Sequence, residues 1–183
     1  QIRQGIAGAM SDSFGIDSHK LSLHPARVSR WLEGGMDWET ARTIYPIYVE
    51  VSPAGACNHR CAFCAVDYIG YKSKFLDAGL LGERLGEMAG LGVKSVMFAG
   101  EGEPLLHTGL GGIIAGARRA GIDCSLTTNA VLMTESFLEE GLSSLAWIKV
   151  SINGGTPETY AAVHRSPAAD FERALGNIRR AVC

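Results

Sequence analysis

The hydrophobic and polar positions of this chain alternate between two periods from residue 45 onward. Apolar, β-rich runs of strand length are separated by longer stretches in which apolar residues recur three and four positions apart. In the stretch 77–91, for example, Leu80, Leu81, Leu85 and Met88 follow a helical period. The pattern predicts strands over residues 47–51, 94–100, 122–128 and 147–153.

Local signals mark where several of the intervening helices begin and end. Thr134 and Thr156 are placed to cap the helices that follow them. Gly121 is expected to end a helix over 109–120. A last helix is expected over 171–182.

Strands that alternate with helices imply a parallel sheet with right-handed crossovers. A complete eight-fold barrel needs roughly 250 residues, and a strand–helix–strand unit about 30 or more. We therefore predict an α/β fold over residues 46–183, an open, partial (β/α) barrel that is truncated after about four to five βα units.

Residues 1–45 lack this alternation and are predicted to be a helical N-terminal extension. The segment HPARVSRWLEGG has its apolar side chains at helical spacing, so a short helix is expected there, packed against the domain that follows. The chain does not open with methionine and stops directly after a helical stretch. We therefore expect it to be a fragment of a longer protein.

Composition is ordinary for a soluble protein, with 183 residues, 46% hydrophobic and 20% charged. Lysine and arginine total 17 against 19 acidic residues, a net charge of -2, which gives no evident patch for nucleic acid or an anionic membrane. No apolar run approaches the roughly 18 residues of a membrane span. Five cysteines, three of them clustered, argue against a disulfide framework and favour the reducing cytoplasm.

The cluster of cysteines is the main chemical signal. Cys57, Cys61 and Cys64 lie in the run CNHRCAFC, directly after the first predicted strand. A structural zinc site needs four ligands, whereas a four-iron cluster held by three thiolates keeps one iron free for another ligand. A zinc site completed by a histidine such as His59 remains the alternative.

Polar and glycine residues follow the other three strands. They are the GEGEP run at 100–104, the TTN run at 127–129 and the SINGG run at 151–155. Because the carboxyl ends of parallel strands meet at one edge of the sheet, we expect these segments to gather around the cysteine loop. The sequence therefore predicts a binding mouth for a polar ligand beside a cluster.

At these positions the chain resembles the radical S-adenosylmethionine (radical SAM) superfamily. The run CNHRCAFC is similar to that family's C-x3-C-x-Φ-C signature, with Phe63 as the aromatic residue. The run GEGEP resembles its glycine–glutamate motif, in the spaced form found in RNA-methylating members. The resemblance covers about residues 45–183.

The resemblance implies that the three cysteines hold a [4Fe-4S] cluster whose fourth iron binds S-adenosyl-L-methionine (SAM). It places the Phe63 backbone against adenine, Glu103 on the methionine amino group, and strand-end residues on the ribose or carboxylate. It assigns no catalytic side chain, and the family's later glycine motif is not found in this chain. The cofactor-binding residues that it implies are Phe63, Gly100, Gly102, Glu103, Pro104, Thr128, Asn129, Ser151 and Asn153.

The activity that the resemblance implies is reductive cleavage of SAM. One electron from a flavodoxin- or ferredoxin-type reductant would yield a 5'-deoxyadenosyl radical that abstracts hydrogen from an unknown substrate. Two alternatives remain open. One is an RNA-modifying radical SAM methyltransferase, and the other is an iron–sulfur electron-transfer or binding module that does not turn SAM over.

Several other polar residues have ordinary interpretations beside functional ones. Cys124 lies within a predicted buried strand and is expected to be a core thiol. Structural or surface roles are favoured for His107 and His164, although either could face the pocket or substrate. Glu101 is expected to face solvent or support a neighbour, and Glu50 could point into the barrel.

Overall fold

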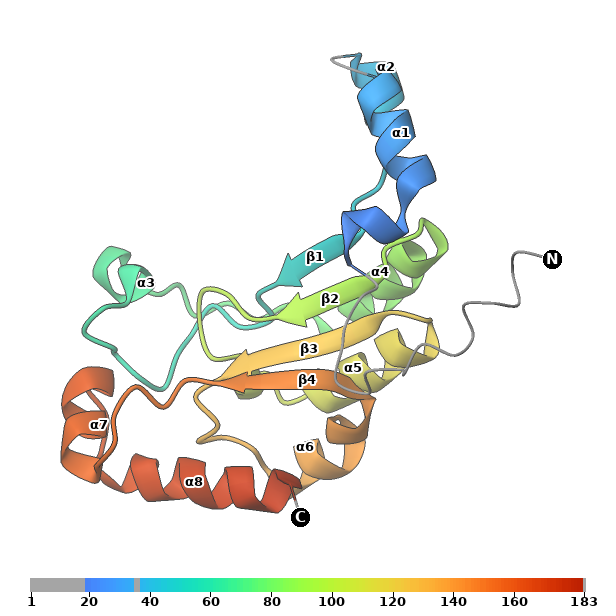
Figure 1. Cartoon of the computed structure of the whole chain (residues 1–183). Coiled ribbons are helices and arrows are strands. Elements are labelled where there is room, and N and C mark those ends of the chain that lie inside the picture. Colours follow the sequence, from blue (N-terminus) through green and yellow to red (C-terminus); the bar gives the residue numbers. More distant parts are fainter. Residues whose placement is uncertain (1–18, 35–36, 183) are drawn as a thin grey trace.

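Four parallel strands form one sheet in the computed structural model, which describes residues 19–34 and 37–182. Their order in the sheet is their order in the sequence, so each crossover leads to the neighbouring strand (Figure 1). This is the open, partial barrel that the sequence predicts. The strands are β1 (Tyr48–Val51), β2 (Ser95–Phe98), β3 (Asp123–Thr128) and β4 (Leu145–Val150).

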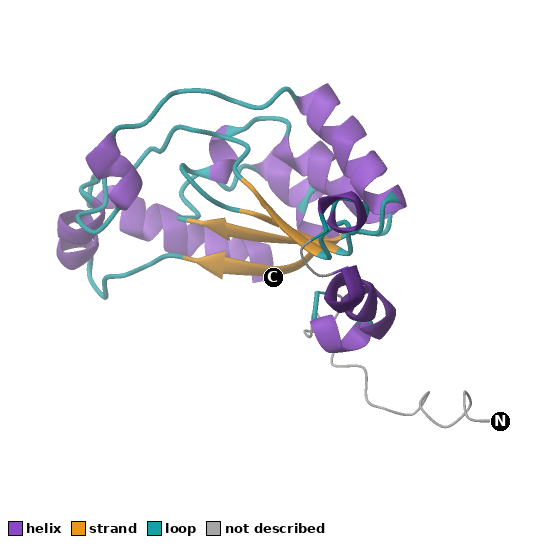
Figure 2. Cartoon of the chain, turned by 90° about the horizontal axis from the view of Figure 1, so that it is seen from above, coloured by secondary structure: helices purple, strands orange, loops and turns teal. Residues whose placement is uncertain are grey.

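Helices cover one face of this sheet (Figure 2). Val96 and Phe98 of β2 and Cys124 and Leu126 of β3 are fully buried beneath them, which confirms that Cys124 is a core thiol. Burial of these side chains is the main force that fixes the helices on the sheet. The helices are α4 (Ala78–Gly90), α5 (Leu110–Arg119), α6 (Glu135–Glu140) and α8 (Ala169–Val182).

The alternate side chains of the strands point to the opposite face, which these helices leave uncovered. Glu50 of β1 stands opposite Met97, and Thr127 of β3 stands opposite Lys149 of β4. Glu50 and Lys149 are exposed there. The Tyr48 hydroxyl donates a hydrogen bond to the Glu50 carboxylate at 2.7 Å, so the partner of Glu50 lies on its own strand.

Most predicted helix boundaries are confirmed by their capping contacts. Thr134 accepts a hydrogen bond from the Phe137 N–H, and Thr156 accepts one from Thr159 at the start of α7 (Pro157–His164). Gly121 follows α5 with a positive φ of 88°. Strand β4 ends at Val150 rather than at residue 153, and Leu80 is 50% exposed although its spacing predicts the buried face of α4.

The N-terminal helices lie at the amino end of β1 and extend away from the sheet (Figure 1). Arg27 donates to the carbonyls of Tyr45 and Pro46, but Trp31 and Leu32 are 61% and 67% exposed. The expected packing of this helix on the domain is therefore wrong for most of its apolar surface, and a domain boundary at residue 45 stays a prediction. The elements are η1 (Leu21–Leu23), α1 (Pro25–Gly34) and α2 (Trp38–Ala41), and residues 1–18 lie outside the described part.

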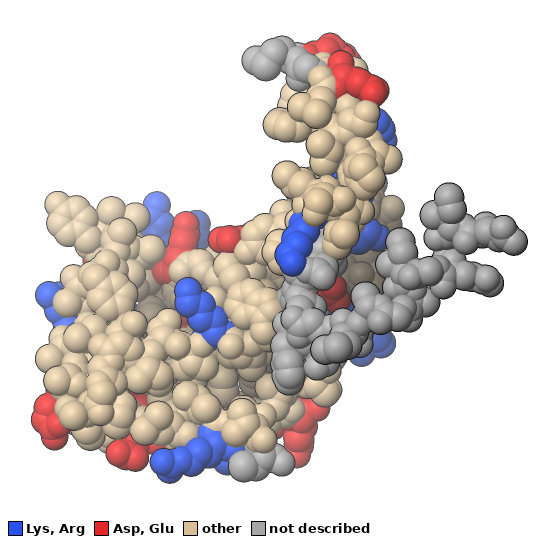
Figure 3. All heavy atoms as spheres, in the orientation of Figure 1, with Lys and Arg blue, Asp and Glu red and all other residues tan. Residues whose placement is uncertain are grey.

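Three short helices complete the described chain, namely α3 (Ala65–Ile69), η2 (Pro104–Leu106) and η3 (Leu142–Ser144). Within the described ranges, no helix combines the length and apolar character needed to cross a bilayer. On the face drawn in Figure 3, charged side chains are scattered and basic residues do not gather into a patch.

Candidate functional site

The carboxyl ends of all four strands open into one cavity of about 230 Å³. It contains every residue that the sequence resemblance selects except Pro104, which is buried at the start of η2. Side chains from four separate loops thus meet at the edge of the sheet where they are predicted to meet. The lining includes Cys57, Cys61, Cys64, Phe63, Gly100, Gly102, Glu103, Thr128, Asn129, Ser151 and Asn153.

Each of the three clustered sulfurs has a different polar partner. Cys57 Sγ accepts the backbone N–H of His59 at 3.4 Å. Cys61 Sγ lies 3.2 Å from His164 Nδ1, and Cys64 Sγ lies 3.4 Å from the Tyr71 hydroxyl. All three are free cysteines.

The surroundings shift the pKa values of these thiols in different directions. Burial raises the pKa of Cys57, and burial together with the neighbouring Cys57 and Cys64 raises the pKa of Cys61 to about 11. Desolvation also acts on Cys64, but the Tyr71 hydroxyl and the backbone N–H groups of α3 outweigh it and lower its pKa. Three thiols close enough to repel one another as thiolates would be stabilised by a shared cation.

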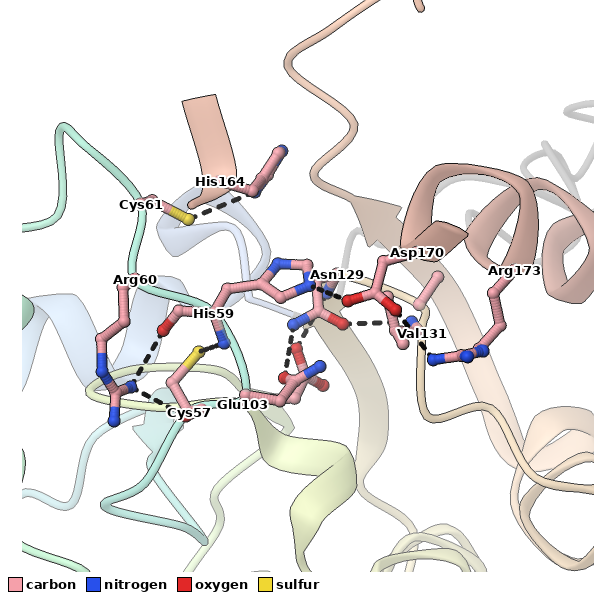
Figure 4. Close-up of polar contacts among 12 residues, drawn as sticks. Cys57, His59, Arg60, Cys61, Glu103, Asn129, Val131, His164, Asp170 and Arg173 are labelled. Atoms are coloured by element: carbon pink, nitrogen blue, oxygen red, sulfur yellow. Dashed lines mark hydrogen bonds and ion pairs between the residues drawn. The ribbon is translucent and has the colours of Figure 1, made fainter. Parts of the chain in front are cut away.

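Helices α7 and α8 hold the cysteine loop in place (Figure 4). His59 Nε2 lies 3.2 Å from the buried carboxylate of Asp170 in α8. The backbone N–H of Arg60 donates to the His164 carbonyl at 3.0 Å, and that of Ala62 donates to Val163. The loop is therefore tied to helices about a hundred residues further along the chain.

These contacts do not favour a zinc site built from the three cysteines and His59. The His59 ring is engaged with Asp170. Among the described residues, the compact group of possible metal ligands that contains His59 has only Cys61 of the three cysteines, together with His164. The donor set that remains is three thiolates around an open cavity, which fits an iron cluster with one free iron.

Glu103 is the buried acidic side chain of the cavity wall. It is only 3% exposed, and burial raises its pKa. Its carboxylate accepts hydrogen bonds from the Thr128 hydroxyl at 2.5 Å and from the backbone N–H of Asn129 at 2.8 Å. The end of β3 therefore fixes the position of this carboxylate.

The glycines before Glu103 allow two loops to approach closely. A side chain at Gly102 would place its Cβ 2.1 Å from the Ala56 carbonyl oxygen and 2.4 Å from that of Ala54. The same contact lets the Glu103 N–H donate to Ala56 at 2.8 Å. Gly100 has φ of +102°, a conformation that favours glycine.

The end of β4 supplies the opposite wall. The Ser151 N–H donates to the Thr128 carbonyl at 3.0 Å, which continues the sheet pairing by one residue. Asn153 adopts a positive φ of 39° in the loop that follows. Both line the cavity, with side chains available to a polar ligand.

Sequence reasoning did not select four further lining residues, Tyr71, Glu101, Thr127 and His164. Glu101 was expected to face solvent and is indeed exposed, at the rim. His164 is 1% exposed and 103 residues from Cys61, so no local pattern could pair them. His107 does not line the cavity, because its Nε2 donates to the Leu76 carbonyl at 2.8 Å.

A sequence model described as the radical SAM superfamily matches residues 51–182. The S-adenosylmethionine-dependent nucleotide dehydratase of Lacinutrix mariniflava is 34% identical over 115 residues, covering 60% of this chain and 24% of that protein. The dTDP-4-amino-4,6-dideoxy-D-glucose ammonia-lyase of Streptomyces venezuelae is 33% identical over 144 residues, 76% of this chain and 30% of that protein. The GTP 3',8-cyclase of Chlorobaculum tepidum is 30% identical over 64% of this chain and 36% of its own length.

Solved structures with much lower identity share the fold. SuiB of Streptococcus suis bound to its precursor peptide SuiA has a TM-score of 0.64 at 17% identity, over 88% of this chain and 35% of that chain. Native anSMEcpe with bound AdoMet has a TM-score of 0.58 at 22% identity, over 75% of this chain and 42% of that chain. The chain thus spans well under half the length of each of these three relatives and two structures.

Proposed function

The chain belongs to the radical SAM superfamily, and from this premise we propose that it is the cluster- and SAM-binding part of an enzyme that generates a 5'-deoxyadenosyl radical. The family's cofactors are a [4Fe-4S] cluster and SAM. The observation that carries the proposal is the single cavity that brings three free cysteines together with Glu103 and the ends of β3 and β4.

Cys57, Cys61 and Cys64 would hold three irons of the cluster, and the open side of the cavity would admit SAM. When bound, these groups supply one-electron cleavage of a C–S bond of SAM, with hydrogen abstraction from the substrate as the result. The electron would come from a flavodoxin- or ferredoxin-type reductant. A cytoplasmic location agrees with three free cysteines and stays a prediction.

The remaining cavity residues would orient SAM. Glu103 is a desolvated acceptor whose position is fixed by Thr128 and Asn129, which suits a ligand amino group. Ser151 and Asn153 offer side chains to the ribose or carboxylate, and the backbone beside Phe63 offers donors and acceptors to adenine. Because Thr128 and Asn129 hold Glu103, we propose that they act on SAM mainly through that carboxylate.

For the substrate we propose a nucleotide or a nucleotide-linked small molecule. Three curated relatives are named for such substrates, a nucleotide dehydratase, a dTDP-sugar ammonia-lyase and a GTP cyclase. The uncovered face of the sheet adjoins the cavity through Thr127, which lines the cavity and stands opposite the exposed Lys149. A cationic side chain at that place suits a phosphate group.

The test begins with anaerobic reconstitution with iron and sulfide. We expect close to four irons and four sulfides per chain, and release of 5'-deoxyadenosine from SAM after reduction with dithionite. Cys57→Ala is expected to abolish both, while Cys124→Ala, which removes a core thiol remote from the cavity, is expected to retain both. Reconstituted protein without iron would contradict the whole proposal.

Three further outcomes distinguish between the possible substrates and classes of protein. Ribose-deuterated nucleotides, GTP first, are expected to transfer deuterium into 5'-deoxyadenosine. Methyl transfer to RNA instead would support the RNA-modifying alternative. A stable cluster that never cleaves SAM would support an electron-transfer or binding module.

A further inference from the structure

The imidazole rings of His59 and His164 lie next to each other, with their centroids 5.2 Å apart. Nε2 of His59 lies 3.2 Å from the Asp170 carboxylate. Nε2 of His164 lies 3.0 Å from the carbonyl oxygen of Ile152. An ionised carboxylate and a carbonyl oxygen can only accept hydrogen bonds. In each neutral ring, Nε2 therefore carries the hydrogen and Nδ1 presents a lone pair.

The two Nδ1 atoms lie near the sulfur of Cys61. Nδ1 of His164 is 3.2 Å from that sulfur, so the thiol donates its hydrogen to the nitrogen. Nδ1 of His59 is buried and has no hydrogen-bond partner among the described residues. In Figure 4 it lies on the side of its ring that is turned away from Asp170 and toward His164. A buried acceptor without a donor requires an explanation, and an ion that uses its lone pair is one.

Together the three side chains form a compact set of metal-binding atoms. One nitrogen of each ring and the Cys61 sulfur all lie within 4.8 Å of one another. Zinc binds thiolate at about 2.3 Å and imidazole at about 2.0–2.1 Å, so a tetrahedral ion holds such atoms about 3.3–3.6 Å apart. Each of them therefore needs to shift by less than about 1 Å to bind one ion.

The surroundings of both rings are those of metal-bound histidines. Such histidines almost always donate their other N–H to a carboxylate or a backbone carbonyl, which fixes the orientation of the ring. His59 and His164 are each 1% exposed, and Tyr160 packs against both rings at centroid distances of 5.8 and 4.1 Å. Side chains held in this way lose little further freedom when they bind an ion.

We propose that the protein without its cluster binds one divalent transition-metal ion, zinc in the first place, on Nδ1 of His59, Nδ1 of His164 and the Cys61 sulfur. The ion takes the place of the thiol hydrogen, which leaves as a proton to water, and no electron is transferred. One thiolate and two imidazoles suit zinc. Cys61 and His164 line the cavity, so water from the cavity completes the coordination.

This site and the cluster exclude each other, because both need the sulfur of Cys61. That consequence rests on the proposed function, whereas the zinc site itself does not. Sites of nitrogen and sulfur ligands bind zinc more tightly than ferrous iron. Zinc bound here is therefore expected to prevent assembly of the cluster.

The first experiment measures zinc binding to metal-free protein by competition with a chromophoric chelator, under anaerobic reducing conditions. We expect one zinc ion per chain. Cys61→Ala should weaken binding about 100-fold or more, since loss of even an outer hydrogen-bond partner costs about 10–100-fold. Cys57→Ala and Cys64→Ala are the matched controls and should bind zinc as the unsubstituted protein does. Equal losses in all three variants would indicate a site of three cysteines and would overturn the inference.

A second measurement needs no substitution. X-ray absorption at the zinc edge, on unsubstituted protein loaded with one zinc ion, should show one sulfur at about 2.3 Å and two imidazole nitrogens at about 2.0–2.1 Å. Three sulfur ligands, or none, would overturn the inference. Protein that binds no zinc would do the same.

Reconstitution with iron and sulfide, with and without prior zinc loading, separates this inference from the proposed function. We expect zinc-loaded protein to take up little iron, and full uptake with zinc still bound would overturn the exclusion. If zinc-free protein takes up no iron but binds zinc through two nitrogens and one sulfur, the proposed function fails and the zinc site stands. If zinc-free protein assembles its cluster and cleaves SAM but does not bind zinc in this way, only the zinc site is lost.

Discussion

At the residue scale, the three cysteines of the site are chemically unequal before any metal binds. Cys61 is the most strongly perturbed, since burial and two neighbouring thiols raise its pKa to about 11. Cys64 is the N-cap residue of α3, and its hydrogen bonds with Tyr71 and the backbone N–H groups of that helix lower its pKa. Reactivity of a thiol follows its thiolate fraction, so the apoprotein should distinguish the two.

We expect iodoacetamide to alkylate Cys64 of the apoprotein first at about pH 8, where its lowered pKa gives it the larger thiolate fraction. The rate at Cys61 should keep rising with pH up to its pKa of about 11, while the rate at Cys64 levels off earlier. Peptide mass spectrometry after timed quenching measures both. Tyr71→Phe should slow the alkylation of Cys64, because it removes a hydrogen bond to that sulfur. Faster alkylation of Cys61 than of Cys64 in the unsubstituted apoprotein would contradict this account.

Gly102 offers a second prediction at this scale. In Gly102→Ala the new Cβ would meet two backbone carbonyl oxygens that cannot move aside without displacing the cysteine loop. We expect a loss of about 1–3 kcal/mol in the free energy of unfolding, with weaker iron uptake. The matched control is Gly82→Ala on the exposed side of α4, where nothing lies within 4 Å and a gain of about 0.5–1 kcal/mol is expected. Urea unfolding of the two apoproteins measures the change in the free energy of unfolding. Equal changes in Gly102→Ala and Gly82→Ala would refute the prediction.

At the scale of the elements, the sequence predicted the features that depend on neighbouring residues along the chain. The strand–helix alternation, the caps at Thr134 and Thr156 and the meeting of four strand ends are all present in the structure. What the sequence could not indicate are contacts between distant segments, such as His164 with Cys61 and Asp170 with His59. Trp31 looked like a buried helix face because periodicity does not tell whether a partner surface exists.

The attachment of α8 to the cysteine loop can be tested through Asp170. Asp170→Ala leaves the His59 ring buried with neither nitrogen hydrogen-bonded, because Nδ1 already has no partner among the described residues. Burial lowers the pKa of His59, so the neutral ring cannot recover the loss by ionising. We expect a loss of about 1–3 kcal/mol in the free energy of unfolding.

Arg173→Ala is the control for that substitution. It removes the other partner of the Asp170 carboxylate, but its side chain is 57% exposed, so less than about 1 kcal/mol should be lost. Urea unfolding of the apoproteins compares the two. If Arg173→Ala lowers the free energy of unfolding as much as Asp170→Ala does, the exposed ion pair rather than the contact with the buried His59 ring holds α8 in place.

At the scale of the whole molecule, the sheet separates a structural side from an open side. Helices cover one face of the sheet (Figure 2) and bury the apolar alternate residues of the strands. Glu50, Thr127 and Lys149 alternate with those residues along the strands and stand on the uncovered face. Thr127 lines the cavity near the carboxyl end of β3. A substrate lying along the open face would therefore reach the cavity in which we propose that the radical is generated.

Lys149 tests whether an anionic substrate uses this route. It is exposed, and no hydrogen bond or ion pair engages its ammonium group among residues 19–34 and 37–182. Lys149→Ala should weaken nucleotide binding about tenfold or more, because a charge-assisted hydrogen bond contributes about 1.5–3 kcal/mol. Equilibrium binding of GTP to the reconstituted protein at fixed salt measures this.

Lys94→Ala is the matched control, since it removes the same charge from the amino end of β2, away from the cavity. A loss of affinity for GTP that occurs only in Lys149→Ala, and that becomes smaller at high salt, would place the phosphate on the open face. If both variants lost affinity for GTP by the same factor, net charge alone would attract the nucleotide. In that event the open face would not be the substrate route, even if SAM were cleaved at the cavity.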